Sequence, residues 1–357
     1  MSFETISNLI FMKLIIFAGG IGTRLWPLSR ENSPKQFDRI FNGRSTLELA
    51  IGRVAPIFGL ENIFIQTQAK YKKIVEDQVP GLPKENIILE PERRNLGPAV
   101  CLAMLHLKKK NYSGPIAILW SDHLMERVEE FVGALRFGEK LIELEPNRFV
   151  FLGERPRFAN NNLGWVRTGA KAGDIDQADY YGFAGWKYKP GIAECDEMYK
   201  SGEYFWNPGY FITSVDFLID QYKQLAPGIF KAVSSGDYAR AEKTHFDEAI
   251  IEKVDLSNAV VLKTNMGWSD PGTLYALKEA LHENSQANVV KGLSSLLDTE
   301  DSLIYNLEAG KLIAGVGLKG MVIVNTPDAL IVAPKNEVVK ITKLIDQMKL
   351  EGLDKYL

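Results

Sequence analysis

The strongest structural signal in the sequence is the stretch KLIIFAGGIGTRLWPLSRENSPKQF, residues 13–37. Its first six residues form a nearly continuous apolar run, the pattern of a strand that is buried on both faces of a parallel sheet. Gly19, Gly20 and Gly22 follow directly, and glycines at the end of such a strand let backbone N–H groups approach a polyphosphate closely. The segment therefore predicts a phosphate-binding loop after the first strand.

Two cations accompany this loop, Arg24 within it and Lys35 after a proline. Taken singly, each is better explained by a surface ion pair with Glu31 or Asp38. A glycine-rich loop with both cations together favours a clamp on the charge of a nucleoside triphosphate.

Two common nucleotide-binding loops are excluded by the spacing. Counted from Gly20, the third glycine of the dinucleotide fingerprint is replaced by Leu25, and Pro27 blocks an ordinary helix start. No GK[ST] sequence ends the loop, so it is not a Walker A loop. A nicotinamide-dependent oxidoreductase is therefore disfavoured.

The rest of the chain predicts an α/β protein with a doubly wound, mostly parallel sheet. An S-x-x-E capping box from Ser45 to Glu48 starts one helix. Further strands are expected at 62–67, 86–90, 115–120 and 148–153, and further helices near 97–109, 129–143, 193–201, 214–224 and 270–282. Residues 159–186 are expected to form lid or antiparallel segments. Such sheets bind ligands where their strands end.

Short β-type runs between residues 288 and 334 predict a small β-rich, β-helix-like unit, which a terminal helix closes. We expect an N-terminal extension at 1–12, a catalytic domain at 13–285 and the small unit at 286–357. Apolar positions on the last helix suggest a homodimer, although burial within the chain is the plainer interpretation. These positions are Ile341, Leu344, Ile345 and Met348.

Composition narrows the class of protein. The 357 residues are 46% hydrophobic and 24% charged, which is typical of a globular protein. The net charge of −3 gives no reason to expect electrostatic binding of nucleic acid or anionic lipid over a large surface. Cys101 and Cys195 form neither a disulfide framework nor a metal motif. No signal peptide or membrane-spanning stretch is apparent. We expect a cytoplasmic protein.

Two aspartates are candidate metal ligands, and one of them, Asp122, lies at the predicted ligand edge of the sheet. Asp122 comes after the strand at 115–120, and spacing alone favours a turn or helix cap there. Asp270 stands before Pro271 in the pattern of a helix N-cap. Two carboxylates would equally suit a hydrated Mg²⁺. His123, in no metal-ligand spacing, is expected to be a positioning residue.

Several motifs of the sequence resemble those of a known family. GGIGTRLWPLSRENSPKQF is similar to the signature of sugar-phosphate nucleotidyltransferases, and its LWPLSR and PKQF portions resemble the mannose-1-phosphate guanylyltransferase branch. The resemblance continues in order through EPERRNLGPA (90–99), WSDH (120–123), WNPGYF (206–211), FDEAIIEK (246–253), GWSDPGTLYAL (267–277) and GMVIVNTPDALIVAPK (320–335).

The resemblance implies Mg²⁺-dependent transfer of a guanylyl group from GTP to a sugar 1-phosphate. It implies Asp122 and Asp270 as metal ligands and Arg24 and Lys35 as catalytic cations. Nucleotide-binding roles fall on Ala18, Gly19, Gly20, Gly22, Thr23, Arg24, Lys35, Glu90, Asn95, Gly97 and Pro98. Sugar-phosphate roles fall on Gly164, Lys189 and Asn207. Asn95 has an alternative role as a plain helix cap.

The sugar end departs from the family pattern. The lid motif reads NNLGWV at 161–166 and keeps only Gly164, while WKYKP at 186–190 places Tyr188 where the family has glutamate. A tyrosine cannot reproduce the charge or the hydrogen bonds of that carboxylate. The expected sugar is mannose 1-phosphate. Another hexose or heptose 1-phosphate, or a non-catalytic protein that binds GTP or a GDP-sugar, remains as an alternative.

Overall fold

The computed structural model describes residues 12–357 except 21, 31–33, 40–42, 189 and 282–285. Within it the chain forms two compact units, each assembled from several stretches. Among the described residues, unit 1 combines the ranges 12–19, 51–120 and 125–268, and unit 2 combines 20–50, 121–124 and 269–357. The predicted domain boundary at residue 285 stays a prediction, because these units join segments that are distant in sequence.

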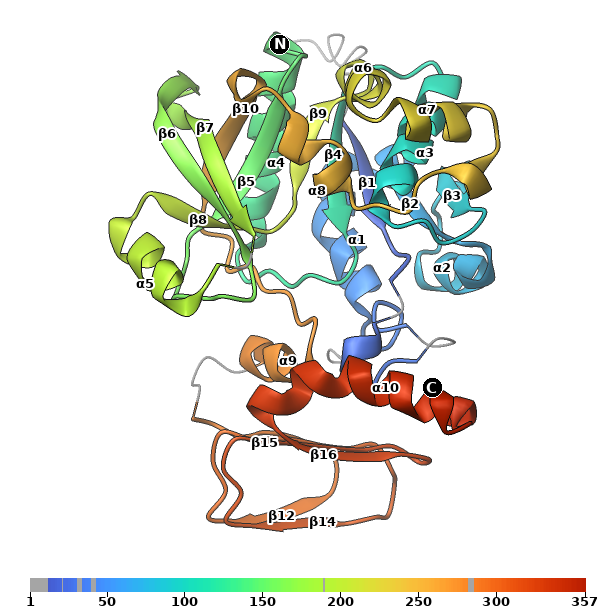
Figure 1. Ribbon diagram of the computed structural model, residues 1–357, viewed down its shortest axis with the longest axis vertical. Coiled ribbons are helices and arrows are strands. Elements are labelled where there is room, and N and C mark those ends of the chain that lie inside the picture. Colours follow the sequence, from blue (N-terminus) through green and yellow to red (C-terminus); the bar gives the residue numbers. More distant parts are fainter. Residues whose placement is uncertain (1–11, 21, 31–33, 40–42, 189, 282–285) are drawn as a thin grey trace, which may run out of the picture. The chain divides into compact units, whose positions relative to one another are not determined.

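Unit 1 is built on a ten-stranded sheet in the order β10-β7-β6-β8-β5-β9-β4-β1-β2-β3 (Figure 1). The strands are β1 (Lys13–Phe17), β2 (Ile63–Gln68), β3 (Ile87–Glu90), β4 (Pro115–Trp120), β5 (Phe149–Glu154), β6 (Gly164–Ile175), β7 (Ala178–Tyr188), β8 (Tyr204–Asn207), β9 (Phe211–Ser214) and β10 (Ala259–Thr264). The five strands expected from apolar runs are all present.

The half of the sheet from β3 to β4 is parallel, in the order 3-2-1-4 of a Rossmann-like core. Phe17 of β1 is paired with Trp120 of β4, so these two strands end side by side. Beyond β4 the sheet is mixed, because β9 runs antiparallel to both β4 and β5. The predicted α/β class is thus confirmed, with an antiparallel extension that the apolar runs did not indicate.

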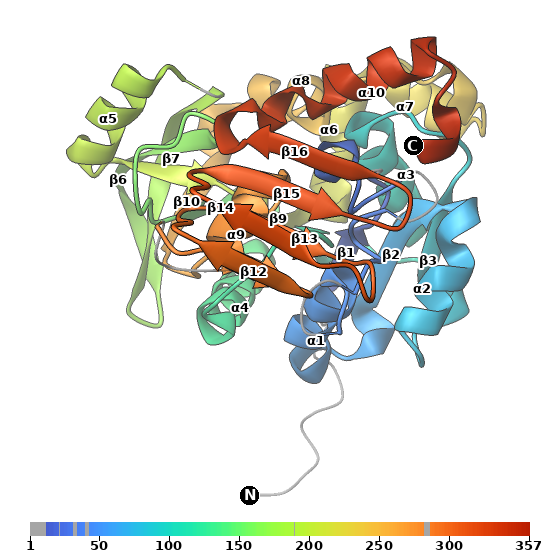
Figure 2. The ribbon, with the colours of Figure 1, turned by 90° about the horizontal axis from the view of Figure 1, so that it is seen from below.

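Helices cover both faces of this sheet (Figures 1 and 2). They are α1 (Thr46–Phe58), α2 (Lys72–Gln78), α3 (Leu96–Lys109), α4 (Val128–Leu144), α5 (Ile192–Ser201), α6 (Val215–Leu225), α7 (Pro227–Ser234) and α8 (Phe246–Ala249). Helices α3, α6, α7 and α8 share one core with alternate side chains of β1, β4 and β5. Helix α4 packs on the opposite face, where Gly138 lets it approach Ile212 of β9.

The predicted capping box at the start of α1 is confirmed. The N–H of Glu48 donates to the hydroxyl of Ser45 over 3.1 Å, and the N–H of Ser45 donates to the Glu48 carboxylate over 2.7 Å. Each side chain thereby satisfies a backbone donor that the first helical turn leaves free.

The segment expected to hold lid or antiparallel elements forms the long hairpin of β6 and β7. Its outer part is mostly exposed, with Tyr180 as a buried exception. At its other end, Gly164 is paired with Tyr188 of β7 and also with Asn207 of β8. The antiparallel prediction is therefore confirmed for this stretch.

Met12 belongs to the core of unit 1, so the predicted N-terminal extension at 1–12 is wrong at this residue. It is fully buried, and its N–H donates to Glu139 over 2.5 Å. The remaining residues of that extension, 1–11, lie outside the described residues.

Unit 2 contains a small β-solenoid, shown in Figure 2. Strands β11 (Val289–Lys291), β13 (Leu303–Asn306) and β15 (Met321–Asn325) run parallel, and β16 (Leu330–Pro334) closes this sheet antiparallel to β15. Strands β12 (Ser294–Leu297) and β14 (Ile313–Val316) form a second parallel pair. In successive coils the Asn325 amide donates to Asn306 over 2.9 Å. These features confirm the β-rich, β-helix-like prediction.

Two helices, α9 (Leu274–Leu281) and α10 (Ile341–Leu350), pack on the solenoid. The face of α10 with Ile341, Ile345 and Met348 is buried within unit 2, and only Leu344 of the predicted apolar positions is exposed. Burial within the chain is therefore the correct interpretation of this face, and the homodimer stays a prediction without support from it.

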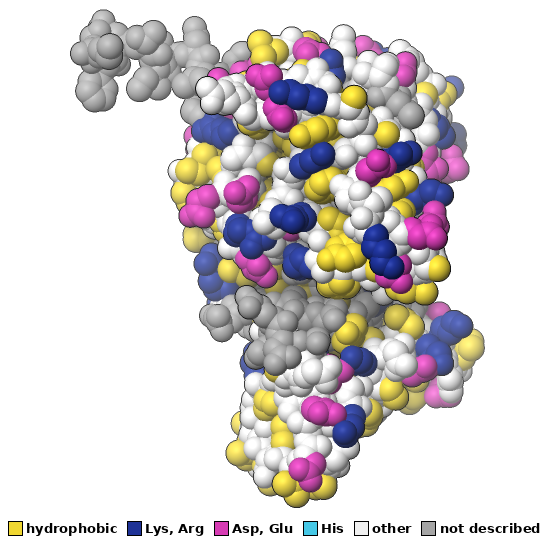
Figure 3. Space-filling model, turned by 90° about the vertical axis from the view of Figure 1, so that its left-hand side faces the viewer, with side chains coloured by type: hydrophobic (Ala, Val, Ile, Leu, Met, Phe, Trp, Pro, Cys, Tyr) yellow, Lys and Arg dark blue, Asp and Glu magenta, His cyan; other side chains and the backbone are white. Residues whose placement is uncertain are grey.

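Basic and acidic side chains are interspersed on the face of the molecule in Figure 3, in agreement with the small net charge.

In the part of the chain that the structure describes, none of the helices combines the length and the apolar character needed to span a bilayer.

Candidate active site

Side chains from the PKQF segment hold the glycine-rich loop in place. The amide of Gln36 donates to the carbonyl of Gly20 over 2.9 Å. Gly22 has φ +69°, which favours glycine, and its carbonyl accepts from the Ser29 hydroxyl. A Cβ at Gly22 would lie 3.0 Å from Cγ of Lys35, so the missing side chain lets the Lys35 stem pack against the loop.

The described residues bring Lys35 together with Asp122 and Asp270. Nζ of Lys35 lies 2.5 Å from Oδ2 of Asp122 and 3.6 Å from Oδ1 of Asp270. The Lys35 side chain is 9% exposed, against 29% and 27% for the two aspartates. A buried cation thus faces two partly open carboxylates. All three residues belong to unit 2.

The charges of this cluster are strongly coupled. Burial alone would lower the pKa of Lys35, but Asp122 and Asp270 raise that pKa above its usual value. Burial alone would likewise raise the pKa of Asp122, but the neighbouring Lys35 ammonium holds it well below its usual range. Both side chains therefore stay charged at neutral pH.

Neither aspartate is a helix cap, contrary to what their spacing favours. Helix α9 begins at Leu274, four residues after Asp270, and the hydroxyl of Thr273 accepts from Ala276 at its first turn. The prediction that this helix starts at residue 270 is therefore wrong. Helix α4 begins only at Val128, so Asp122 does not cap it. The helix-cap explanation is therefore removed for both carboxylates, whereas the turn that spacing also favours for Asp122 is confirmed, because Ser121 and Asp122 form a turn.

The cluster fits a hydrated divalent cation. Oδ1 of Asp270 is buried and has no hydrogen-bond partner. A Cβ at Gly272 would lie 2.9 Å from this oxygen and 3.1 Å from Nη2 of Arg24, so glycine leaves open a small space that both groups border. Hard carboxylate oxygens are the ligands that Mg²⁺ prefers. Among the described residues, however, no cluster of three or more His, Cys, Asp or Glu side chains suited to a metal ion occurs.

A second group of predicted residues lies in unit 1, where β1 ends. Two hydrogen bonds hold Ala18 against β2. Its N–H donates to the Gln66 carbonyl over 2.8 Å, and its carbonyl accepts from the Thr67 hydroxyl over 2.7 Å. A Cβ at Gly19 would lie 3.6 Å from Oε1 of Glu90, the last residue of β3. The end of β1 thus presents Gly19 beside a carboxyl group.

Glu90 is 8% exposed, and burial raises the pKa of its carboxyl to about 7. Its Oε1 accepts one hydrogen bond from the Gln66 amide, at 3.3 Å. The amide oxygen of Gln66 is buried without a hydrogen-bond partner. Buried polar groups with spare hydrogen-bonding capacity are typical of a site that a ligand completes.

The segment after β3 makes hydrogen bonds within the protein at positions that were predicted to bind the nucleotide. Asn95 stands at the N-cap position of α3, but its side chain caps nothing and its φ is +61°. The N–H of Gly97 donates to the Thr244 carbonyl over 3.0 Å, and its carbonyl accepts from the Tyr222 hydroxyl. Pro98 is buried in the first turn of α3. The backbone of Gly97 is thus engaged by the protein itself, and the simple helix-cap interpretation of Asn95 is wrong.

The residues predicted for the sugar phosphate lie along β6, β7 and β8 of unit 1 as far as they are described. Gly164 is paired with both Tyr188 and Asn207. The Asn207 amide oxygen accepts a hydrogen bond from the N–H of Gly209 over 2.9 Å. Tyr188 is 68% exposed. Lys189 lies outside the described residues.

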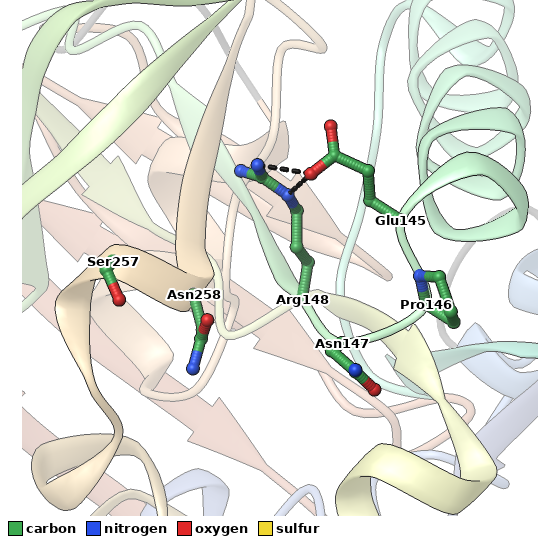
Figure 4. Close-up of a pocket in the computed structure, with 6 residues that line it drawn as sticks. All are labelled: Glu145, Pro146, Asn147, Arg148, Ser257 and Asn258. Carbon is green, nitrogen blue, oxygen red and sulfur yellow. Dashed lines mark hydrogen bonds and ion pairs between the residues drawn. The ribbon is translucent and has the colours of Figure 1, made fainter.

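One pocket of about 300 Å³ is separate from all these residues (Figure 4). It lies where β5 and β10 begin, and Arg148 within it is paired with Glu145. Ligands of α/β sheets bind where parallel strands end. This pocket is therefore not the predicted site.

Three residues that position or complete the site escaped the sequence analysis. Gln36 and Ser29 hold the loop, and Gln66 contacts Glu90. A signal existed for Gln66, since a polar residue inside the apolar run NIFIQT requires a buried partner. Nothing in the sequence distinguishes Ser29 from an ordinary loop serine.

Comparison with known proteins identifies the family of this chain. Residues 13–287 match the family model described as nucleotidyl transferase, and residues 294–348 match the mannose-phosphate isomerase/GMP-like β-helix domain. The chain is 32% identical over 360 residues to a mannose-1-phosphate guanylyltransferase of Salmonella typhimurium, covering 96% of this chain and 73% of that protein. It is also 32% identical to one of Escherichia coli K12, covering 95% and 73%.

A solved structure shows the same fold along almost the whole chain. It is described as a mannose-1-phosphate geranyltransferase from Thermus thermophilus and matches with a TM-score of 0.84 at 26% identity, covering 95% of this chain and all of that one. The match includes the Rossmann-like core and the β-solenoid. On these grounds the chain belongs to the nucleotidyl transferase family.

Proposed function

We propose that this chain is a mannose-1-phosphate guanylyltransferase, which converts GTP and α-D-mannose 1-phosphate into GDP-mannose and pyrophosphate with Mg²⁺ as cofactor. The observation that carries the proposal is the cluster of Lys35, Asp122 and Asp270, in which a buried cation lies beside two carboxylates. Nucleotidyl transfer needs such paired charges to hold a metal ion and to neutralise a triphosphate. The curated relatives support the choice of substrates.

In the proposed reaction, an oxygen of the sugar phosphate attacks the α-phosphorus of GTP in line, and pyrophosphate leaves. The nucleophile is already an anion at neutral pH, so no general base is required. Lys35 and Arg24 would neutralise the charge on the triphosphate oxygens. When bound at Asp122 and Asp270, Mg²⁺ would supply Lewis-acid stabilisation of the phosphate oxygens.

The surroundings of Glu90 support guanine as the base. The hydrogen-bonding edge of guanine carries two adjacent donors, N1–H and the 2-amino group, which match the two oxygens of an ionised carboxylate. The corresponding edge of adenine has one donor and one acceptor. Glu90 is 8% exposed, so a base that failed to pair with it would leave a buried carboxylate unsatisfied.

Two finer proposals accompany this one. Both cysteines are free and buried, which fits a reducing compartment, and we propose the cytoplasm as the location. For the sugar, exposed Tyr188 stands where the family pattern has glutamate, so a different hexose or heptose 1-phosphate is the second candidate.

The test is pyrophosphate release by the purified chain, with GTP, ATP, UTP or dTTP offered against mannose, glucose and heptose 1-phosphates. The proposal predicts release with GTP and mannose 1-phosphate, and its loss when EDTA removes the metal. Release only with another sugar would move the specificity to the strands around Tyr188. Absence of release from every pair, with GTP still bound, would indicate a regulatory protein instead.

A further inference from the structure

The ammonium group of Lys35 occupies the space that faces both carboxylates of the cluster. It lies 2.5 Å from one oxygen of Asp122, whereas the 3.6 Å to Asp270 is too long for a hydrogen bond. Oδ1 of Asp270 consequently remains buried without a hydrogen-bond partner. One positive charge is thus shared by two negative charges and satisfies only one of them fully.

Packing holds the stem of Lys35, whereas charge holds its ammonium group. Lys35 is 7% exposed, and its Cβ and Cγ contact the backbone of Gly22, where a side chain would lie within 3.0–3.1 Å of them. The carbonyl of Gly22 is itself held by Ser29. The stem of Lys35 is therefore held in place, and only the outer atoms of the side chain can move from one partner to another.

Asp122 and Asp270 are too few to hold a divalent ion by themselves. Mg²⁺ and Mn²⁺ prefer six oxygen ligands, and the described residues add no third carboxylate, histidine or cysteine to the pair. The remaining ligands would be water and phosphate oxygens. A divalent ion beside the two aspartates would also be repelled by the Lys35 ammonium at its present position.

We propose that Lys35 occupies the metal position in the absence of nucleotide, so that metal and nucleotide load together. This inference rests on the proposed function in one respect, because it takes Asp122 and Asp270 as the metal ligands. The ammonium group substitutes for the ion between the carboxylates. A triphosphate offers Lys35 a more strongly charged partner, draws it away from Asp122, and supplies the oxygens that complete the coordination of the metal.

The experiment measures Mn²⁺ binding by titration calorimetry without nucleotide, in the unaltered chain and in Lys35→Met. Methionine keeps the length and apolar stem of lysine but removes its charge. We expect Lys35→Met to bind Mn²⁺ at least about tenfold more tightly than the unaltered chain. Equal or weaker binding by Lys35→Met would overturn the proposal.

Arg24→Met is the matched control. It removes one positive charge that borders the same space at Gly272, but it leaves Lys35 between the carboxylates. We expect Mn²⁺ affinity in Arg24→Met to stay within about threefold of the unaltered chain. A gain as large as that of Lys35→Met would mean that the charge of the region, not occupation of the metal position, controls binding.

A second measurement needs no variant and therefore stands even if Lys35→Met does not fold. Inorganic pyrophosphate is added to the unaltered chain, and the Mn²⁺ affinity is corrected for metal that pyrophosphate binds in solution. The proposal predicts that pyrophosphate tightens Mn²⁺ binding about tenfold or more. Unchanged affinity would contradict it. If no form of the chain binds Mn²⁺ under any condition, the metal assignment of the proposed function fails instead.

Discussion

Replacing Glu90 by Gln tests whether the chain keeps a buried carboxyl group at the cost of stability. The group is 8% exposed, and burial raises its pKa from the ordinary 4.5 to about 7. Glutamine has nearly the same shape, and its side-chain oxygen still accepts the hydrogen bond from Gln66. The substitution therefore removes the charge and little else.

The sign and size of the effect follow from this pKa. Because the folded-state pKa lies above the unfolded one, protonation favours the folded chain, and this contribution to stability is complete below pH 4.5. It is lost as the pH rises through about 7. The difference between 4.5 and about 7 corresponds to about 3 kcal/mol at about 1.4 kcal/mol per pKa unit, and the low exposure leaves little to solvent screening.

The assay is urea denaturation of both forms between pH 4.5 and 8.5. Glu90→Gln should gain stability relative to the unaltered chain as the pH rises, by up to about 3 kcal/mol at the alkaline end. Its affinity for GTP should fall, because an ionised acceptor for the base is lost. Glu92→Gln, an exposed change in the same loop, serves as the control and should stay within about 0.5 kcal/mol at every pH. A pH-independent difference between Glu90→Gln and the unaltered chain would refute the reasoning.

Three further substitutions test individual features of the site. Gly22→Ala forces a side chain into φ +69° and against Lys35, so stability should fall by about 1 kcal/mol and kcat should fall with it; unchanged kcat would mean that this contact does not position the lysine. Gly97→Ala places a Cβ 2.9 Å from the Thr244 carbonyl and should cost about 1–3 kcal/mol in denaturant unfolding, whereas an unaltered midpoint would show that the turn yields easily. Tyr188→Glu should raise kcat/KM for mannose 1-phosphate over glucose 1-phosphate, and an unchanged ratio would remove Tyr188 from sugar selection.

The buried part of the sheet was predictable because its strands are nearly continuous apolar runs. β1 and β4 lie inside two helical layers, so almost every position is apolar and the pattern identifies the strand. The hairpin of β6 and β7 is different, because its outer half is mostly exposed and buries few apolar side chains, Tyr180 among them, so the apolar pattern there is weak. Such a strand is visible only once its partner is known.

At the site, the local sequence pattern predicts the wrong role for Asp270. Asp270 before Pro271 has the pattern of an N-cap, but the chain runs on to Thr273 before the helix begins. Only the resemblance to a family selected Asp122 and Asp270 together. That Lys35 would lie between them depends on contacts among segments far apart in the sequence, which no local pattern encodes.

We propose that Asp122 and Asp270 hold the metal ion on which the transfer depends. The most direct test compares steady-state pyrophosphate release from GTP and mannose 1-phosphate by the unaltered chain, Asp270→Asn and the exposed control Asp298→Asn. We expect a loss of at least about a thousandfold in kcat for Asp270→Asn, with circular dichroism and thermal unfolding close to those of the unaltered chain, and near-normal activity for the control. An Asp270→Asn variant that keeps its kcat at saturating Mg²⁺ would show that Asp270 does not hold the metal ion.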